Sequence, residues 1–158
     1  MMSTSTSLSH TQPLRKSAMM NALKVLLVDD DPLVRRALRT TLTSAGYAVV
    51  EAWTGEDALE KISAESADVI LLDLKMPGMG GLEACRRIRE VADTPIMVIS
   101  ILRTEEFRVQ ASDAGADDYL VKPFGIQDLV SRIQALRRRV AGLESTLSTG
   151  SLSVKNLL

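Results

Sequence analysis

The chain has 158 residues, of which 46% are hydrophobic and 25% charged, as in an ordinary globular protein with one domain. Its 19 basic and 20 acidic residues nearly cancel, which argues against nucleic acid as the main partner of these residues. The single Cys85 excludes an internal disulfide and a cysteine zinc site, and it fits a reducing compartment. No apolar run is as long as a membrane span and residues 1–20 lack the apolar block of a signal peptide, so we expect a cytoplasmic protein without membrane contact.

Short apolar runs alternate with amphipathic segments after a polar beginning. Residues 1–22 are rich in Ser and Thr and lack hydrophobic periodicity, so we predict a disordered N-terminal tail. Strands are expected at residues 23–28, 47–52, 68–73, 95–100 and 118–121, and helices at 32–45, from 54 onward, at 82–91, 104–114 and 126–141. This alternation predicts an α/β fold, a doubly wound parallel sheet of five strands with five helices on its two faces.

Several helices carry local signals. Asp31 is a suitable N-cap and Pro32 a suitable first residue for the first helix, and Gly46 is expected to follow its end. The segment 104–114 has few large apolar anchors besides Phe107, so this helix is predicted to be weakly held. Cys85 has the helical spacing of core residues, which indicates burial.

Polar residues end the apolar runs of four predicted strands. Asp29 and Asp30 follow the first run, Asp73 ends the third, Ser100 ends the fourth and Lys122 follows the fifth. Because parallel strands place their carboxyl ends at one edge of a sheet, we expect these five side chains in one cleft. Close carboxylates repel one another unless a cation neutralises them, and oxygen ligands of this kind suit Mg²⁺. Since Lys122, Ser100 and Mg²⁺ are suited to bind phosphoryl oxygens, Asp73 is the candidate nucleophile.

These residues lie in four motifs that resemble the receiver domain of two-component response regulators. The motifs are Val28-Asp-Asp-Asp-Pro32, Leu72-Asp-Leu-Lys-Met-Pro77, Ile99-Ser100 and Lys122-Pro-Phe124. The resemblance covers residues 23–141 and implies a flavodoxin-like sheet with strand order 2-1-3-4-5. It also implies that Asp73 accepts a phosphoryl group from a sensor histidine kinase or a small phosphodonor. Such a protein is a regulator in signal transduction, and it catalyses only its own phosphorylation and slow dephosphorylation.

The resemblance assigns roles to the residues of the cleft. Asp30 would bind Mg²⁺ directly, Asp29 through a water molecule and Lys75 through its backbone carbonyl, with Asp73 as a further ligand. Lys122 would bind the phosphoryl group, and its bond to the following proline would be cis.

A switch is implied by the same resemblance. Ser100 would sense the phosphoryl group by moving toward it, and Tyr119 would then turn inward and change the neighbouring surface. A half-buried strand residue without a switching role is the alternative for Tyr119.

Residues 113–119 and 122–126 resemble the OmpR/PhoB transcription regulators and, within them, the regulators of potassium uptake. This resemblance implies a symmetric homodimer, formed on phosphorylation, through the helix at 104–114, the strand at 118–121 and the helix at 126–141. The expected pairs between the two copies are Arg108 with Asp128, Asp113 with Arg132, and Asp118 with Arg139. Exposed pairs of this kind specify orientation more than affinity, and ordinary solvated helix charges are the alternative.

Residues 142–158 resemble an interdomain linker followed by the first strand of a winged-helix DNA-binding domain. DNA would be bound only through the rest of such a domain, which these 158 residues do not contain. Whether the receiver is part of a longer regulator or stands alone is left open by the sequence.

Two positions depart from the family. Ile101 stands where alanine is usual and could crowd the approach to the phosphoacceptor, and the ammonium of Lys75 could pair with Asp29 or Asp30 in competition with Mg²⁺. Two other functions stay open. One is a receiver fold that binds partners without being phosphorylated. The other is an aspartyl phosphatase of the haloacid dehalogenase type with the phosphoryl group on Asp29, although Leu33 stands where that family needs Thr or Val.

Overall fold

Five parallel strands form the centre of the protein, and each is a short, mostly apolar run. They are β1 (Lys24–Val28), β2 (Ala48–Ala52), β3 (Val69–Asp73), β4 (Ile96–Ser100) and β5 (Asp118–Val121). The strands lie in the order β2-β1-β3-β4-β5 and pair in parallel throughout, which confirms the predicted fold class and strand order. The structure, a computed structural model, describes residues 22–148, and of residues 141–148 the backbone alone. The predicted tail, apart from Ala22, and the end of the predicted linker lie outside the described residues.

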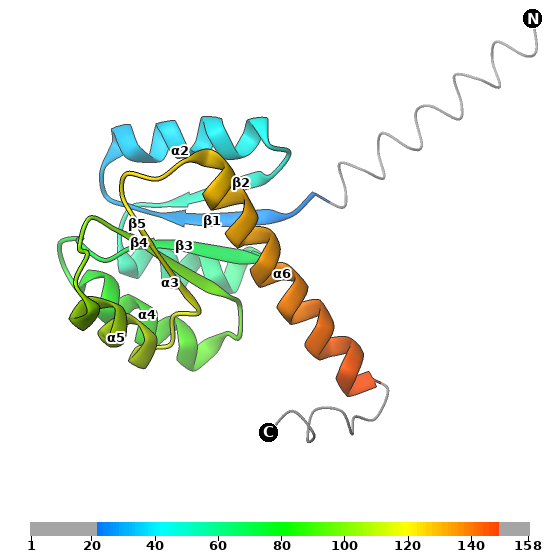
Figure 1. Ribbon diagram of the computed structural model, residues 1–158. Coiled ribbons are helices and arrows are strands. Elements are labelled where there is room, and N and C mark those ends of the chain that lie inside the picture. Colours follow the sequence, from blue (N-terminus) through cyan, green and yellow to red (C-terminus); the bar gives the residue numbers. More distant parts are fainter. Residues whose placement is uncertain (1–21, 149–158) are drawn as a thin grey trace, which may run out of the picture.

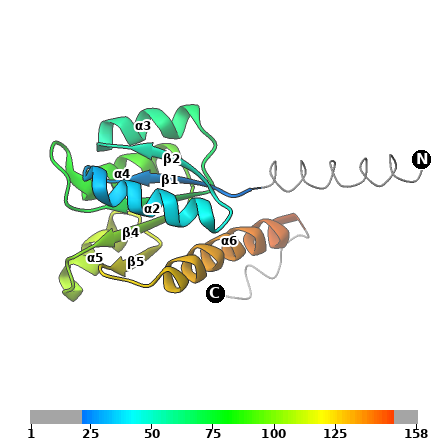
Figure 2. The same cartoon turned by 90° about the horizontal axis from the view of Figure 1, so that it is seen from above.

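Helices cover both faces of this sheet (Figures 1 and 2). They are α2 (Pro32–Ser44), α3 (Gly55–Ala64), α4 (Gly80–Val91), α5 (Glu105–Asp113) and α6 (Ile126–Ser148). One apolar cluster joins α2 and α6 to the sheet and includes Leu42, Ile133 and Leu71. A second cluster, on the other face, joins α3 and α4 to the sheet through residues such as Ile88 and Ile70. Two cores on opposite faces of one sheet are what right-handed crossovers between parallel strands produce.

The helix boundaries differ from the prediction by more than one residue in two places. α4 begins at Gly80, two residues before the expected start at residue 82, and α6 continues to Ser148, seven residues beyond the expected end at residue 141. The predicted linker therefore begins as helix. A single glycine such as Gly142 costs a helix only about 1 kcal/mol relative to alanine, so it does not end a helix whose neighbours continue it.

α5 has the thin apolar contact that its sequence predicts. Ala111 is its one buried residue, Phe107 is half-buried, and Val109 is 48% exposed. Its N-cap residue, Thr104, makes no side-chain cap hydrogen bond. Cys85 in α4 shows the opposite behaviour, since it is fully buried, as predicted. Local stability follows buried apolar contact, so α5 is expected to be the more easily displaced of the two helices.

Candidate functional site

Three carboxylates meet at the edge of the sheet where β1 and β3 end. One oxygen each of Asp29, Asp30 and Asp73 lie within 4.8 Å of one another. The register explains the meeting, because Val28 of β1 lies opposite Leu72 of β3 and the residue that follows each of them is an aspartate. The predicted convergence of these three residues is therefore present in the structure.

Burial distinguishes the three carboxylates. Asp29 is 2% exposed and Asp73 8%, whereas Asp30 is exposed. The start of α4 lies close behind Asp73, where the Gly81 N–H donates to the Leu74 carbonyl over 3.1 Å. A Cβ atom at Gly81 would overlap the carbonyl oxygen of Asp73 and lie 2.5 Å from the Cα atom of Leu74. The absence of a side chain at residue 81 is thus what allows this helix to begin beside the site.

The turn after β1 is ordered by its own side chains. The Asp31 N–H donates to Oδ1 of Asp29 over 2.9 Å, and Oδ1 of Asp31 accepts from the Leu33 N–H over 2.9 Å. Asp31 is therefore the N-cap of α2, with Pro32 as first helical residue, as the sequence predicts. Because Asp31 is committed to the cap, the carboxylates that face one another are those of Asp29, Asp30 and Asp73. This geometry gives no support to a dehalogenase-type pair of Asp29 and Asp31.

Lys122 brings a positive charge to the acidic group. Its Nζ lies 3.3 Å from Oδ2 of Asp29, and its side chain is 20% exposed. The Lys122 N–H donates to the Ser100 carbonyl over 2.8 Å, which joins the ends of β4 and β5. The bond between Lys122 and Pro123 is cis, as the family resemblance implies. Lysine and carboxylates thus face one another across the strand ends.

The electrostatics of Asp73 show what the site is suited to hold. Burial, countered by the charge of Lys122 and reinforced by Asp29 and Asp30, raises the pKa of Asp73 to about 6. The Lys75 N–H, which donates to Oδ1 of Asp73 over 3.3 Å, opposes this rise in pKa. A buried carboxylate close to two others is stabilised by a cation, and a set of oxygen donors fits a hard divalent ion such as Mg²⁺.

Ser100 and Tyr119 are linked through one residue of the loop after β4. Ser100 is fully buried, and its Oγ accepts from the Leu102 N–H over 3.0 Å. The Tyr119 hydroxyl donates to the Leu102 carbonyl over 2.7 Å, and the ring is 6% exposed. The Tyr119 side chain is therefore buried with its hydroxyl bound to a main-chain acceptor, and a turn of the ring on phosphorylation stays a prediction.

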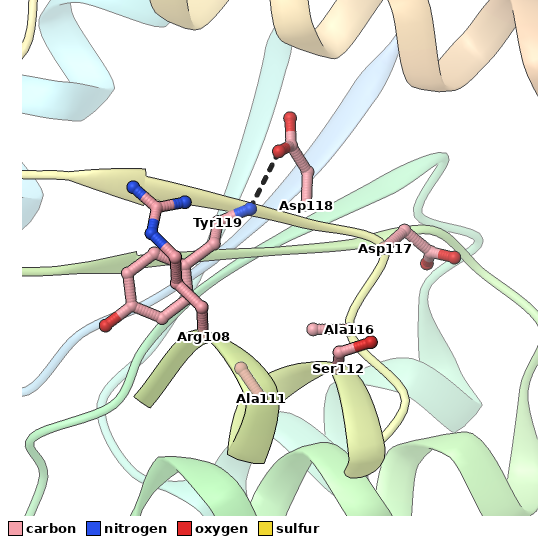
Figure 3. A pocket seen from close by; sticks show the side chains of 7 residues that line it. All are labelled: Arg108, Ala111, Ser112, Ala116, Asp117, Asp118 and Tyr119. Carbon is pink, nitrogen blue, oxygen red and sulfur yellow. Dashed lines mark hydrogen bonds between the residues drawn. The ribbon is translucent and has the colours of Figure 1, made fainter. Parts of the chain in front are cut away.

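Charged residues surround Tyr119 on the face formed by α5 and β5. Figure 3 shows Arg108 lying over the Tyr119 ring, with the guanidinium carbon 5.0 Å from the ring centroid. Both residues line a cavity of about 170 Å³ together with Ala111, Ser112, Ala116, Asp117 and Asp118. Arg132 of α6 binds Asp118 over 2.9 Å and Asp128 over 2.8 Å within the same chain. Two of the carboxylates expected to pair across a dimer therefore have a partner in their own chain, and Asp113 and Arg139 are exposed on α5 and α6.

The two residues that depart from the family pattern, Ile101 and Lys75, are exposed to solvent. Ile101 is 56% exposed at the rim. Lys75 is exposed, and among the described side chains no ion pair joins it to Asp29 or Asp30. Lys122, not Lys75, is the lysine that lies against the acidic group. In the described part of the chain, no contact thus supports competition between the Lys75 ammonium and Mg²⁺.

One residue near the site was missed by the reasoning from sequence. Arg35 of α2 is 7% exposed, and its Nη1 donates to the main-chain carbonyl of Asp29 over 2.7 Å. A signal for it exists, because Arg35 stands three and seven residues before Leu38 and Leu42, on the inward face of the helix. An arginine at core spacing indicates a partner inside the fold, and one of its partners here is a backbone atom.

The chain belongs to the family of response regulator receiver domains, whose family model matches residues 25–134. Among curated proteins it is 43% identical to "Transcriptional regulatory protein ResD" of Bacillus subtilis over 138 residues, which are 87% of this chain and 57% of ResD. It is 41% identical to "Response regulator MprA" of Mycolicibacterium vanbaalenii, over 84% of this chain and 60% of MprA. Both relatives are regulators of the OmpR/PhoB type, which confirms the resemblance to that subfamily. The chain spans less than two thirds of the length of these relatives.

Solved structures agree with the family. CheY4 of Vibrio cholerae superposes with a TM-score of 0.70 at 35% identity, over 73% of this chain and 98% of that one. The receiver domain of the Francisella response regulator 1452 gives 0.71 at 33% identity, over 75% and 98% of the two chains. Within residues 22–148, no helix is long and apolar enough to cross a membrane.

Proposed function

We propose that the protein is a Mg²⁺-dependent phosphoacceptor and that Asp73 carries the phosphoryl group. The observation that supports this most strongly is the meeting of Asp29, Asp30 and Asp73 within 4.8 Å, with the Lys122 ammonium 3.3 Å from Asp29. Asp73 is the carboxylate at the end of the central strand, and at neutral pH it is ionised even with a pKa of about 6. It therefore needs no general base to act as a nucleophile.

The proposed reaction is phosphoryl transfer from a phosphohistidine of a sensor histidine kinase, or from a small phosphodonor. With phosphohistidine as donor, one oxygen of Asp73 forms the bond to phosphorus while the bond from phosphorus to the histidine nitrogen breaks, and the leaving imidazole keeps the electron pair and takes a proton from water. Asp30, Asp73 and the Lys75 carbonyl would hold Mg²⁺ directly and Asp29 would hold it through a water molecule, and the ion would supply neutralising charge at the transferring group. Lys122 binds a phosphoryl oxygen, and the Ser100 hydroxyl reports the arrival of the group.

The proposed output is a symmetric homodimer through α5, β5 and α6. Tyr119 and Ser100 both bind Leu102, so a movement of Ser100 toward the phosphoryl group acts on the loop that holds the Tyr119 hydroxyl. The weak apolar contact of α5 makes its surface easy to rearrange. Since ResD is named a transcriptional regulatory protein, we further propose that the switch controls transcription in the cytoplasm. DNA contact would come from an effector domain, for which the additional length of ResD and MprA leaves room.

Intact mass spectrometry tests the phosphoacceptor. Wild type treated with a small phosphodonor and Mg²⁺ is expected to gain one phosphoryl group, and D73A is expected to gain none. D30N is expected to be phosphorylated slowly, because it loses a proposed metal ligand but keeps the nucleophile. An equal gain in wild type and D73A would remove Asp73 from its role, and borohydride trapping with peptide mapping would locate the modified residue.

Analytical ultracentrifugation tests the dimer. Beryllofluoride, which imitates a phosphoryl group on aspartate, is expected to raise the dimer fraction of wild type and to leave D73A monomeric. Unchanged sedimentation of wild type over a wide concentration range would contradict the dimer and leave the phosphoacceptor untouched. Lack of both phosphorylation and Mg²⁺ binding would instead favour a receiver fold that only binds partners.

A further inference from the structure

Among the residues that the structure describes, four polar or charged side chains are buried, namely Asp29, Arg35, Asp73 and Ser100. Three of them have a part in the proposed reaction, and Arg35 does not. An arginine is rarely buried without a partner, because removing its charge from water is costly. The contacts of Arg35 should therefore explain why its side chain is buried.

Arg35 connects two parts of the protein through its guanidinium. Nη1 donates to the Asp29 carbonyl over 2.7 Å, and Nε donates to Oε1 of Glu51 in β2 over 3.2 Å. The guanidinium carbon lies over the Trp53 ring, 4.7 Å from its centroid. Planar stacking and two separate acceptors use the fixed fork of an arginine, which a lysine does not possess. These three contacts hold the guanidinium in one orientation.

The contact of Arg35 with Asp29 fixes the main chain at the start of the acidic turn, residues 29–31. The Asp29 N–H donates to the Ala52 carbonyl over 3.1 Å, so with Arg35 both main-chain polar groups of Asp29 are bound. The plane of the peptide bond between Asp29 and Asp30 is thereby held. That plane decides where the Cα atom of Asp30 lies and hence where its exposed carboxylate points. The Asp29 carboxylate is bound by Lys122 and the Asp31 N–H. The Asp30 carboxylate is instead oriented through the main chain that Arg35 holds.

We propose that Arg35 is a positioning residue of the divalent-cation site, which holds the Asp29–Asp30 peptide so that both carboxylates face the cation. This inference rests on the proposed function, since it concerns the affinity of the same site for Mg²⁺. Arg35 does not contact the reacting atoms and acts only through Asp29 and Asp30. Groups behind metal ligands act in this way, by fixing the orientation of the ligands.

The chain offers a matched control for this proposal. Arg39, one turn along α2, also binds Glu51, with Nη1 2.6 Å from Oε2, but it does not reach Asp29. R39M therefore removes one arginine from Glu51 and leaves the Asp29 carbonyl bound. R35M removes both contacts, and R35K keeps the positive charge while losing the fork. A comparison of the three variants separates orientation of the acidic turn from the charge balance around Glu51.

The experiment measures Mg²⁺ affinity directly by calorimetry and, in parallel, the Mg²⁺ concentration that gives half the maximal rate of phosphorylation. We expect R35M and R35K to bind Mg²⁺ about tenfold more weakly than wild type, the size typical of lost support behind a metal ligand. R39M is expected to bind Mg²⁺ as wild type does. At saturating Mg²⁺ the phosphorylation rates of R35M and R35K are expected to approach that of wild type. A general loss of structure would lower the maximal rate without moving the half-saturating concentration.

Each outcome decides something. If wild type neither binds Mg²⁺ nor becomes phosphorylated, the proposed function fails and the inference fails with it. If wild type does both and the folded Arg35 variants bind Mg²⁺ equally well, the inference is overturned while the proposed function stands. An equal loss in R39M would assign the effect to Glu51 and overturn the role of Arg35. Urea unfolding identifies a variant that does not fold, and if R35M is one, R35K decides the question.

Discussion

The acidic edge of the sheet and the face formed by α5 and β5 are held in different ways. At the acidic edge, the single residue Asp29 has four hydrogen-bond partners. They are the Ala52 carbonyl, Arg35, Lys122 and the Asp31 N–H. On the other face, α5 has one buried residue, and the Tyr119 hydroxyl makes its hydrogen bond to the loop after β4. Phosphoryl chemistry needs fixed distances, whereas a switch needs a part that moves at little cost. In the proposed function the two regions would meet these two demands separately, so the effects of substitutions in the two regions should differ in size.

The largest effect is expected at Gly81, where α4 approaches the site. G81A places a Cβ atom against the Asp73 carbonyl and Leu74, both backbone atoms of the central strand end that cannot move aside easily. We expect a loss of about 3 kcal/mol or more in the free energy of unfolding, measured with urea. G125A is the control, because nothing lies within 4 Å of a Cβ atom there, and it should change stability little. A G81A protein as stable as wild type would mean that the start of α4 is not rigid.

Asp73 should destabilise the metal-free protein at neutral pH. Its pKa is about 6 in the folded state against 3.8 ordinarily, so the folded state binds the proton more tightly. Stability therefore falls as the pH rises through this interval, and D73N avoids a penalty of at most about 3 kcal/mol. In chelator, D73N is expected to be more stable than wild type near neutral pH, and the gain should vanish below the ordinary pKa.

Urea unfolding at several pH values measures this difference, and D93N serves as the control because Asp93 is an exposed carboxyl. Added Mg²⁺ should narrow the gap by stabilising wild type more than D73N. A gain that persists undiminished in acid would show that the carboxylate charge is not the cause.

A smaller effect is expected at Tyr119, on the weakly held face. Y119F removes the hydrogen bond to the Leu102 carbonyl, and we expect a loss of about 1 kcal/mol in the free energy of unfolding. Hydrogen exchange should become faster in α5 and in the loop that contains Leu102, while β1 and β3 keep their protection. Faster exchange spread evenly over the sheet would mean that the two regions do not differ as we describe.

The smallest effect on stability is expected at Arg132. Its pairs with Asp118 and Asp128 are partly exposed, so R132A should lower the free energy of unfolding by about 0–1 kcal/mol, and less in high salt. Its effect on the dimer should be larger than on the monomer, because the proposed interface includes Arg132. Sedimentation with beryllofluoride measures this, with R138A on the exposed part of α6 as control. A dimer fraction in R132A equal to that of wild type would remove Arg132 from the interface.

Reasoning from sequence was most successful where a structural rule connects neighbouring residues. Apolar runs, the Asp31 cap and the thin face of α5 are local patterns, and the structure confirms each. The meeting of Asp29, Asp30 and Asp73 also followed from sequence, because parallel strands end at one edge of the sheet. The predicted end of α6 at residue 141 was wrong, because glycine weakens a helix without necessarily ending it.

The sequence by itself determined the fold class, the strand order through its family motifs, and the group of residues at the acidic edge. Only the tertiary structure decided that Arg35 binds the Asp29 carbonyl, that the Tyr119 hydroxyl binds the Leu102 carbonyl, and that Arg132 has two partners in its own chain. The physical reason lies in the acceptors. Every residue carries a main-chain carbonyl, so the carbonyls of Asp29 and Leu102 have no signature in sequence, and only the packing of α2 and the loop after β4 brings a donor to them.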